Sequence, residues 1–308
     1  MPNFIDENGF ADVSVIIPAY QSALTIGRAL KSAANQTCKP REVVIVDDGS
    51  TDHTKAICVA FKTNMDGIDL KIYQQKNAGA GAARNRAIKE ATGKYLAFLD
   101  ADDEWLPEKL QISLLKMHDG NNVLTSHNYV SIKPKSKNQI DCAALFAATT
   151  QPYSALYRKG FIATSSVVVE REAVLNAGGF DQTLPNAQDF DLWLEILKRR
   201  PDDFDVFAEA LTNYHVTPGS IMSHTASRLR CTINIACRHA LSLKLLNQPV
   251  LINLWYRILA VHYEALVSYR DQNKPFSLIL TAAQLPFNLI FATVTYNSNK
   301  FQDRPKFI

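Results

Sequence analysis

Cysteines, net charge and internal repeats are all scarce in this chain of 308 residues, and each shortage excludes a class of protein. The five cysteines are odd in number and include no CxxC pair, which argues against a disulfide framework or a zinc knuckle. The 33 basic and 30 acidic residues give a formal net charge of only +3, so we expect no nucleic-acid partner. Residues 1–12 have neither a basic leader nor an apolar core and do not resemble a secretory signal. We therefore expect the protein to act in the cytoplasm.

Short apolar runs alternate with amphipathic segments over the N-terminal third of the chain. The apolar runs have the length of buried strands, and the segments between them carry apolar residues at helical spacing. This alternation predicts a doubly wound, mostly parallel α/β sheet flanked by helices. The expected strands are 13–17, 42–46, 70–73 and 95–99, and the expected helices are 22–34, 52–61 and 80–92.

The remainder of the chain predicts a second half of the same unit and a helical appendage. We divide the whole chain into an α/β unit, residues 1–225, and a C-terminal helical region, residues 226–308. Within the α/β unit, we expect one half over residues 13–103 and the other over residues 104–225. Further expected elements are helices at 107–116, 189–200 and within 232–270, strands at 122–130 and 161–169, and a polar surface loop that ends at Asp141.

Aspartates follow two of the predicted buried strands, at positions 47–48 and 100–103. In open α/β sheets, ligands bind beyond the carboxyl ends of the strands. Carboxylates crowded there suit Mn²⁺ or Mg²⁺, which also stabilises a departing diphosphate. The side chains of Asp100 and Asp102 point to the same side if the chain stays extended, so that two oxygens reach one cation. The alternative is that these aspartates only form a turn before Trp105.

The segment 77–86 is rich in small residues and carries Arg84 and Arg86. Small residues let the backbone approach a ligand closely, and arginine donates paired hydrogen bonds to phosphate. The order of its glycines is not the GxGxxG of dinucleotide-binding proteins. Earlier in the chain, Asp48 is the candidate ligand contact and Asp52 the candidate helix cap.

Six segments, taken in order, carry a family resemblance. They are 15–20, 47–50, 83–85, 98–103, 178–181 and 189–194. Together they resemble the family 2 glycosyltransferases of the GT-A fold. The resemblance implies inverting transfer of a sugar from a nucleoside diphosphate sugar, most often a UDP-sugar, to the hydroxyl of a carbohydrate or lipid-linked acceptor. It also implies Mn²⁺ or Mg²⁺ as cofactor and a part in cell-surface or extracellular polysaccharide synthesis. On this resemblance residues 1–225 are the expected catalytic unit, with the nucleotide-binding half at 13–103 and the acceptor half at 104–225.

The same resemblance implies roles for single residues. Asp102, in the DXD motif, would bind the metal. Asp189 would be the general base that takes the proton of the acceptor hydroxyl, with a helix N-cap as its alternative role, and Asp191 has a purely helical role. The implied nucleotide-sugar contacts are Pro18, Tyr20, Asp48, Arg84, Asp100 and Ala101.

Two segments depart from the family pattern. Gln188 stands where the family often has Glu, and His215 and Thr217 replace an Arg-x-His segment. We treat His215, Thr164 and Gln188 as candidate acceptor or diphosphate contacts, with His224 as another candidate for the diphosphate. These departures keep a non-catalytic nucleotide-sugar-binding protein as one alternative, and a metal-dependent nucleotidyltransferase is the other.

Residues 275–299 contain no charged side chain and are long enough to cross a bilayer. Polar residues and Pro286 interrupt the stretch, so we expect an interfacial or protein-buried helical hairpin instead. The alternative is a helix packed on the catalytic unit. Peripheral contact with the inner face of the membrane would bring anionic headgroups to the basic residues Lys300, Arg304 and Lys306.

Overall fold

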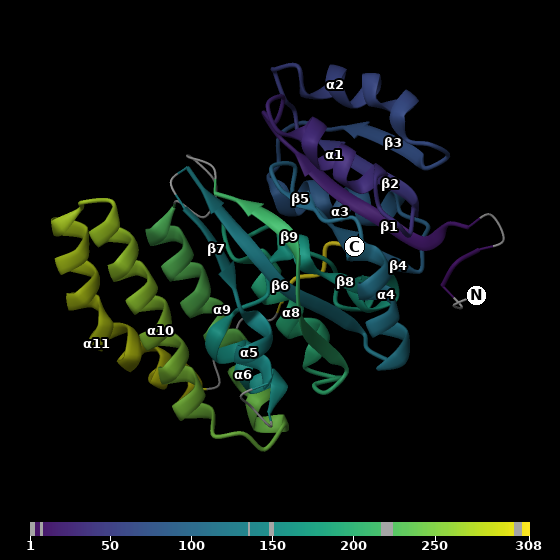
Figure 1. Ribbon diagram of the computed structural model, residues 1–308. Coiled ribbons are helices and arrows are strands. Elements are labelled where there is room, and N and C mark those ends of the chain that lie inside the picture. The colour runs from purple at the N-terminus through teal and green to yellow at the C-terminus, as the bar shows by residue number, and fades with distance from the viewer. Residues whose placement is uncertain (1–3, 7–8, 135, 148–150, 217–223, 299–303) are drawn as a thin grey trace.

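The computed structural model describes residues 4–6, 9–134, 136–147, 151–216, 224–298 and 304–308. A central sheet lies between helices, and the last long helices stand to one side of it (Figure 1). Along the sheet the strand order is β3-β2-β1-β4-β8-β6-β9-β5, and β7 pairs with β6. This architecture is the predicted α/β fold with a helical C-terminal appendage.

The first four strands are parallel. β1 (Ala11–Ala19) lies between β2 (Pro40–Asp47) and β4 (Tyr95–Phe98), and β3 (Asp69–Gln74) pairs with β2. Parallel strands start and end at the same edges of a sheet. The carboxyl ends of β2 and β4, where the aspartates follow, therefore lie at one edge with β1 between them.

Helices cover both faces of these strands. α1 (Ile26–Ala34) and α4 (Lys109–Asp119) pack with Val15 and Ile17 of β1, whereas α3 (Ala80–Glu90) packs with Ile16. Alternate residues of β1 thus enter two separate cores. Burial on both faces is the reason that these strands appear in the sequence as unbroken apolar runs.

The direction of the sheet changes beyond β4. β8 (Val168–Glu170) is antiparallel to both β4 and β6 (Leu124–Lys133), and β6 is parallel to β9 (Phe204–His215). β5 (Glu104–Trp105) pairs antiparallel with the outer part of β9, and β7 (Ser136–Ile140) forms a hairpin with β6. The turn after β4 consequently lies where the parallel half meets the mixed half.

The other helices include three that were not expected, and two short 3₁₀ turns lie among them. These helices and turns are α2 (Thr54–Ala60), η1 (Phe61–Asn64), α5 (Cys142–Ala147), α6 (Pro152–Lys159), η2 (Thr164–Ser166), α7 (Arg171–Asn176), α8 (Gln188–Leu197), α9 (Thr225–Leu245), α10 (Val250–Asp271) and α11 (Pro275–Asn297). The three unexpected helices are α5, α6 and α7.

Two expectations about the middle of the chain were wrong. The strand expected at 161–169 is mostly a loop with the turn η2, and only its end joins β8. There the Ser166 hydroxyl donates to the carbonyl of Ala163 at 2.6 Å, and such local hydrogen bonds compete with strand pairing. The polar loop expected before Asp141 contains β7, because its backbone completes the edge of β6.

The C-terminal region was also predicted incorrectly in part. Residues 275–297 form one continuous helix and no hairpin of their own, with Pro286 inside it. α11 instead forms a hairpin with α10, in which Trp255 Nε1 donates to Thr293 Oγ1 at 3.0 Å. Since α9 places Ile235 and Ala236 in the core that also holds Trp193, packing is continuous across the predicted boundary at residue 225. That boundary stays a prediction.

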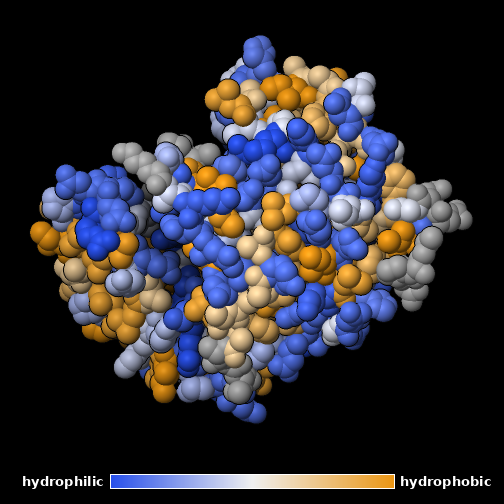
Figure 2. Space-filling model, in the orientation of Figure 1, coloured by the Kyte–Doolittle hydropathy of each residue, from blue (hydrophilic) through white to orange (hydrophobic). Residues whose placement is uncertain are grey.

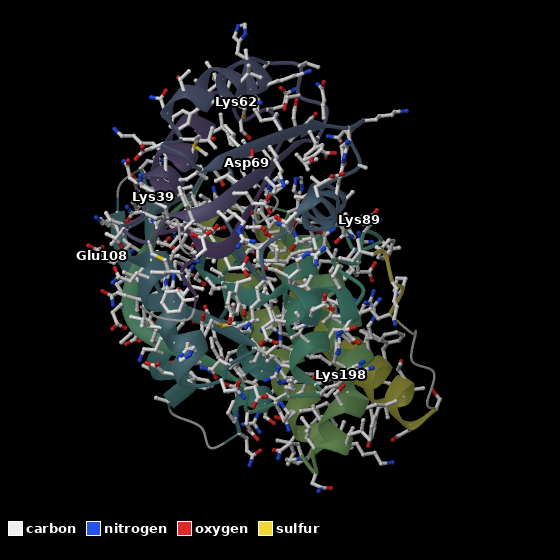
Figure 3. All side chains as sticks on the ribbon, turned by 90° about the vertical axis from the view of Figure 1, so that its right-hand side faces the viewer. Lys39, Lys62, Asp69, Lys89, Glu108 and Lys198 are labelled. Carbon is white, nitrogen blue, oxygen red and sulfur yellow. The ribbon has the colours of Figure 1, made fainter. Side chains whose placement is uncertain are left out.

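α10 and α11 are both long and apolar enough to cross a membrane by length and composition. The two helices differ in burial. Of the 18-residue apolar stretch of each helix, 44% is buried inside the protein in α10 and 11% in α11. Figure 2 shows hydrophobic residues gathered on the side of the molecule where these helices lie, whereas charged side chains such as Lys62, Asp69 and Lys89 surround the catalytic unit in Figure 3.

Candidate active site

The turn after β4 is held by hydrogen bonds from both halves of the sheet. The Arg84 guanidinium, on α3, donates to Asp100 Oδ1 at 2.6 Å. The Asp100 backbone N–H donates to Ser165 Oγ at 3.1 Å, and the backbone N–H of Asp103 donates to the Asp100 carbonyl at 3.0 Å. The expected DXD motif is therefore a turn fixed between α3 and the η2 loop.

Asp103 stabilises this turn through hydrogen bonds to two other parts of the chain. Its buried carboxylate accepts a hydrogen bond from the Ser165 hydroxyl at 2.5 Å and one from the His215 backbone N–H at 3.0 Å. Burial, with the charges of Asp100 and Asp102, raises the pKa of Asp103 well above its ordinary range. Asp103 thus connects the DXD turn to the end of β9, a structural role that no local pattern in the sequence indicated.

Asp189 lies in the first turn of α8 and faces the η2 loop. Thr164 Oγ1 donates to Asp189 Oδ2 at 2.9 Å, and the Phe190 N–H donates to Asp189 Oδ1 at 2.8 Å. The residue before α8 that caps it is Ala187, so the alternative role of Asp189 as N-cap is not the observed one. Thr164, one of the candidate acceptor contacts, orients the candidate base.

Arg84 brings these two acidic groups into one electrostatic site. Burial disfavours its charge, but the carboxylates of Asp100, Asp189 and Asp102 outweigh burial and raise the pKa of Arg84 above its ordinary value. Its guanidinium also lies 5.3 Å from the centre of the Phe180 ring. The structure therefore brings Asp189 to the same electrostatic site as Arg84, Asp100 and Asp102, which lie at least 87 positions earlier in the sequence.

Asp48 has protein partners on both carboxylate oxygens. Oδ1 accepts from Gln75 Nε2 at 2.8 Å and from the Ala78 N–H at 2.9 Å, and Oδ2 accepts from the Gly79 N–H at 2.8 Å. These bonds fix the loop that leads into α3. Asp52 has a structural role, because Thr54 donates to its Oδ1 through both the backbone N–H and the hydroxyl, but the N-cap position of α2 is taken by His53.

The other predicted contacts take different positions. Pro18 lies near the end of β1, Tyr20 follows that strand with 53% of its surface exposed, and Ala101 is buried in the DXD turn. Gln188 Nε2 donates to the Leu184 carbonyl at 2.6 Å, and its side chain packs over Gly81, where an added Cβ would lie 2.6 Å from Gln188 Oε1. Gln188 thus joins α8 to the small-residue entrance of α3. Thr217 lies outside the described residues.

His215 offers a nitrogen near the DXD turn. Its Nε2 is buried without a hydrogen-bond partner and lies 4.0 Å from Glu104 Oε2. Burial and the charge of Arg28 lower the pKa of His215, against the effect of Glu104, so the imidazole is neutral at pH 7. A neutral imidazole is the form that binds metals or accepts a proton.

The oxygen and nitrogen atoms near the DXD turn suit a cation whose other ligands come from the substrate and water. In the part of the chain that the structure describes, no three His, Cys, Asp or Glu side chains gather as metal ligands. Mg²⁺ commonly binds through one or two carboxylates together with substrate phosphates, and keeps waters in its other positions. Asp102 has a carboxylate of this kind, and its neighbour Asp103 accepts a hydrogen bond from the backbone N–H of His215, whose Nε2 is unpartnered.

Comparisons with known proteins show the family and the fold. The profile of glycosyl transferase family 2 matches residues 14–174. The amylovoran biosynthesis glycosyltransferase AmsB of Erwinia amylovora is 34% identical over 66% of this chain and 69% of its own length. WfgD of Escherichia coli, a UDP-Glc:alpha-D-GlcNAc-diphosphoundecaprenol beta-1,3-glucosyltransferase, is 30% identical over 71% of this chain and 82% of its own length.

A solved structure shares the fold. Residues 1–349 of S. aureus TarS, in complex with UDP-GlcNAc, align with a TM-score of 0.67 at 20% identity over 93% of this chain and 88% of that one. The chain spans about a third of the length of three Rickettsia relatives, between 30% and 35% of each. The family profile covers more than half of the chain and includes β1, α3 and the DXD turn, so the protein belongs to glycosyl transferase family 2.

Proposed function

We propose that the protein transfers a sugar from a UDP-sugar to an acceptor hydroxyl with inversion at the anomeric carbon. The observation that carries this proposal is that neighbouring residues of one loop bind both acidic groups: Thr164 donates to Asp189, Ser165 accepts from the Asp100 N–H, and the buried Arg84 pairs with Asp100. Asp189 lies on α8 in the proposed acceptor half, and Asp100 and Asp102 lie in the proposed nucleotide half. Such a division suits a reaction between a nucleotide-bound donor and a second substrate.

In the proposed reaction, Asp189 accepts the proton of the acceptor hydroxyl while that oxygen attacks the anomeric carbon. The bond from the anomeric carbon to the diphosphate oxygen breaks, and UDP leaves with the bonding electrons. The Thr164 hydroxyl holds Asp189 Oδ2, and the Phe190 N–H holds Oδ1, so the carboxylate has a defined orientation before substrates bind. Only one carboxylate is needed, because a diphosphate is a far better leaving group than a sugar alkoxide.

The donor site is proposed at the carboxyl ends of β1, β2 and β4. Asp48, Pro18 and Tyr20 would contact the base and ribose, and Asp100 and Ala101 would contact the ribose and donor sugar. Asp102 would hold Mn²⁺ or Mg²⁺, with His215 as a further contact to the metal or diphosphate. When bound, the cation supplies positive charge to the leaving diphosphate.

The acceptor proposal rests on a relative. The name of WfgD gives UDP-Glc as its donor and a diphosphoundecaprenol-linked sugar as its acceptor. We extend this to a carbohydrate or lipid-linked acceptor here, in cell-surface or extracellular polysaccharide synthesis. Gln188, which lies beside Asp189 at the start of α8, would face that acceptor.

A lipid-linked acceptor agrees with the apolar surface of α10 and α11. Most of the large exposed side chains of α11 are aliphatic or aromatic, with Ile290 63% and Phe287 71% exposed, and Gln284 is a polar exception. A helix with so large an exposed apolar surface is stabilised by contact with protein core or lipid. We propose that this hairpin lies on the inner face of the membrane, and that the protein is otherwise cytoplasmic.

The donor site is tested by calorimetric titration with UDP and then GDP, each with and without Mn²⁺. We expect UDP binding that needs the metal and that Asp102→Ala weakens at least ~10-fold, or about 1.4 kcal/mol. Asp119→Ala is the matched control, since this exposed aspartate lies at the far end of α4. Absence of binding by either nucleotide would overturn the donor site. Release of pyrophosphate from a nucleoside triphosphate would instead identify a nucleotidyltransferase.

A further inference from the structure

A buried ionic cluster lies directly behind the proposed base, two residues further along α8. The Asp191 carboxylate is fully buried and touches three basic side chains. Oδ1 is 2.9 Å from His239 Nε2 and 3.0 Å from Arg238 Nη1, and Oδ2 is 2.6 Å from Arg304 Nε. Burial disfavours its charge, but His239, Arg304 and Arg238 hold the pKa of Asp191 well below its ordinary range. Asp191 is therefore ionised and does more than the purely helical role expected of it.

Arg304 comes from the segment 304–308, which returns to the catalytic unit after α11. In Figure 1 the C-terminal mark lies among the teal elements of that unit and away from the hairpin. Only 5% of the Arg304 side chain is exposed, and its two terminal nitrogens donate to the carbonyls of Ala177 and Gly179. The expectation that Arg304 meets lipid headgroups is therefore wrong, because its charge is neutralised inside the protein. Lys300 lies outside the described residues.

The glycine pair at 178–179 makes room for this segment. Both residues have positive φ, +81° and +73°. A Cβ on Gly178 would lie 3.0 Å from the Cα of Lys306, and one on Gly179 would lie 2.7 Å from the side chain of Ile308. The Phe307 N–H also donates to the Gly178 carbonyl at 2.9 Å. Because Gly178 and Gly179 have no side chains, the segment 304–308 packs closely against their backbone.

The backbone next to this glycine pair also forms hydrogen bonds with α3. Asn85 Nδ2 donates to the Phe180 carbonyl at 2.8 Å, and the Phe180 N–H donates to Asn85 Oδ1 at 2.7 Å. Asn85 adjoins Arg84, the residue that pairs with Asp100. Residues 177–180 therefore lie between the donor half of the site and Arg304.

The first residues of α8 follow a strained backbone conformation that neighbouring contacts must stabilise. Ala187, the residue before the helix, has φ +56°, a conformation that costs a non-glycine residue free energy and persists only where its surroundings impose it. Asp189 follows in the first turn, and the Asp191 N–H donates to the Ala187 carbonyl at 3.2 Å. A contact that fixes Asp191 thereby fixes the turn that carries the proposed base.

We propose that Arg304 is a positioning residue for Asp189. By binding Asp191, Ala177 and Gly179 together, it holds the first turn of α8 against the 177–180 segment, so that the Asp189 carboxylate stays directed at the acceptor hydroxyl. This inference rests on the proposed function. It assigns Arg304 no contact with either substrate.

The test compares Arg304→Ala with Lys306→Ala in the full chain. Lys306→Ala alters the same segment and keeps the Cβ that packs on Gly178, but it leaves the Asp191 cluster intact. We expect Arg304→Ala to lower kcat ~10- to 100-fold, the size of effect that a small misplacement of a catalytic group produces. The dissociation constant for UDP should change less than ~2-fold, and amide hydrogen exchange should accelerate at residues 188–192. Arg304→Lys should recover part of kcat, since it restores the charge but not both carbonyl contacts.

Equal kcat and equal exchange in Arg304→Ala and Lys306→Ala would overturn the inference. So would parallel losses of kcat and UDP affinity, because they would indicate general unfolding of the site. If Arg304→Ala does not fold, Arg304→Lys decides by the same two measurements. If the parent protein binds UDP and turns over a donor, the proposed function stands whatever the result for these variants. If the parent shows no turnover, the proposed function itself is contradicted.

Discussion

Arg84 Nη2 lies 2.6 Å from Asp100 Oδ1, and this ion pair joins the helix after β3 to the turn after β4. Both side chains are largely buried, 11% and 27% exposed. A charged hydrogen bond at such depth stabilises the fold as well as the site.

Substitution of Arg84 by Ala should therefore reduce both stability and nucleotide binding. We expect the free energy of unfolding to fall by about 1.5–3 kcal/mol, because Asp100 is left without its charged partner. Urea denaturation measures the loss, with Arg86→Ala as control, since Arg86 donates to the exposed carbonyl of Gln74. Equal stability of the two variants would contradict the structural role of the ion pair.

Substitution of Asp189 by Asn separates catalysis from donor binding. The amide keeps the shape of the carboxylate but does not accept the proton of the acceptor, so kcat should fall ~100- to 10,000-fold. UDP affinity should stay unchanged. Initial rates of UDP release report kcat, and Asp202→Asn, at an exposed acid beyond α8, is the control. A variant as active as the parent would remove Asp189 from the mechanism, and a parent with no activity would favour a non-catalytic binding protein.

Glu42 makes the stability of the nucleotide-binding half depend on pH. This buried carboxylate accepts hydrogen bonds from the Ser14 hydroxyl at 2.5 Å and the Thr92 N–H at 2.6 Å, and it pairs with Lys71. Burial acts to raise its pKa, but Lys71, Ser14 and Thr92 outweigh burial and lower it below the ordinary value.

A lowered folded-state pKa means that Glu42 stabilises the protein above its unfolded-state pKa of about 4.3 and loses that contribution as pH falls through the folded-state value. The parent should therefore exceed Glu42→Gln in stability by about 1–3 kcal/mol at pH 7. The gap should narrow below pH ~4. Thermal unfolding at pH 7, 5 and 3 measures it, and a gap independent of pH would show that Glu42 is not ionised in the folded protein.

Charges placed on α11 should abolish membrane binding. The double variant Phe287→Glu and Ile290→Glu puts two carboxylates on the exposed apolar surface, whereas Val59→Glu, at a half-exposed site on α2, is the control. We expect the parent and the control to sediment with vesicles that contain anionic lipid, and the double variant to stay in solution. Binding by all three would contradict the orientation proposed for the hairpin. If the parent forms dimers and does not bind vesicles, the partner of the exposed apolar surface of α11 is a second copy of the protein.

The parallel half of the fold could be predicted because its strands are buried on both faces. Runs such as 43–46 and 95–99 are apolar throughout, and the helices between them have clear periodicity. The acceptor half lacks that regularity. Residues 163–166 have the composition of a strand, but their hydroxyls bond to nearby backbone and to Asp103, so Ser165 was missed as the residue that ties the DXD turn to β9.

Candidate site residues could be predicted where a local motif carries them, and their roles stay predictions. Asp100, Asp102, Asp189 and Arg84 each belong to a short pattern, and hydrogen bonds of Arg84, Ser165 and Thr164 connect the turn of Asp100 with Asp189. Asp191 belongs to the same pattern as Asp189, yet its partners lie 47, 48 and 113 positions away. Neither spacing nor periodicity reports pairs at such separations. Only the packing of α9 and the last segment against α8 reveals them.

The glycine pair at 178–179 also has a consequence for sequence evolution. Since a side chain on Gly178 would occupy the space of the Lys306 backbone, the two regions are not free to change independently. A relative with a larger residue at this position must carry its chain end elsewhere, and must stabilise its counterpart of Asp191 by another cation. Covariation between these glycines and the residues after α11 would thus mark which family members share this arrangement.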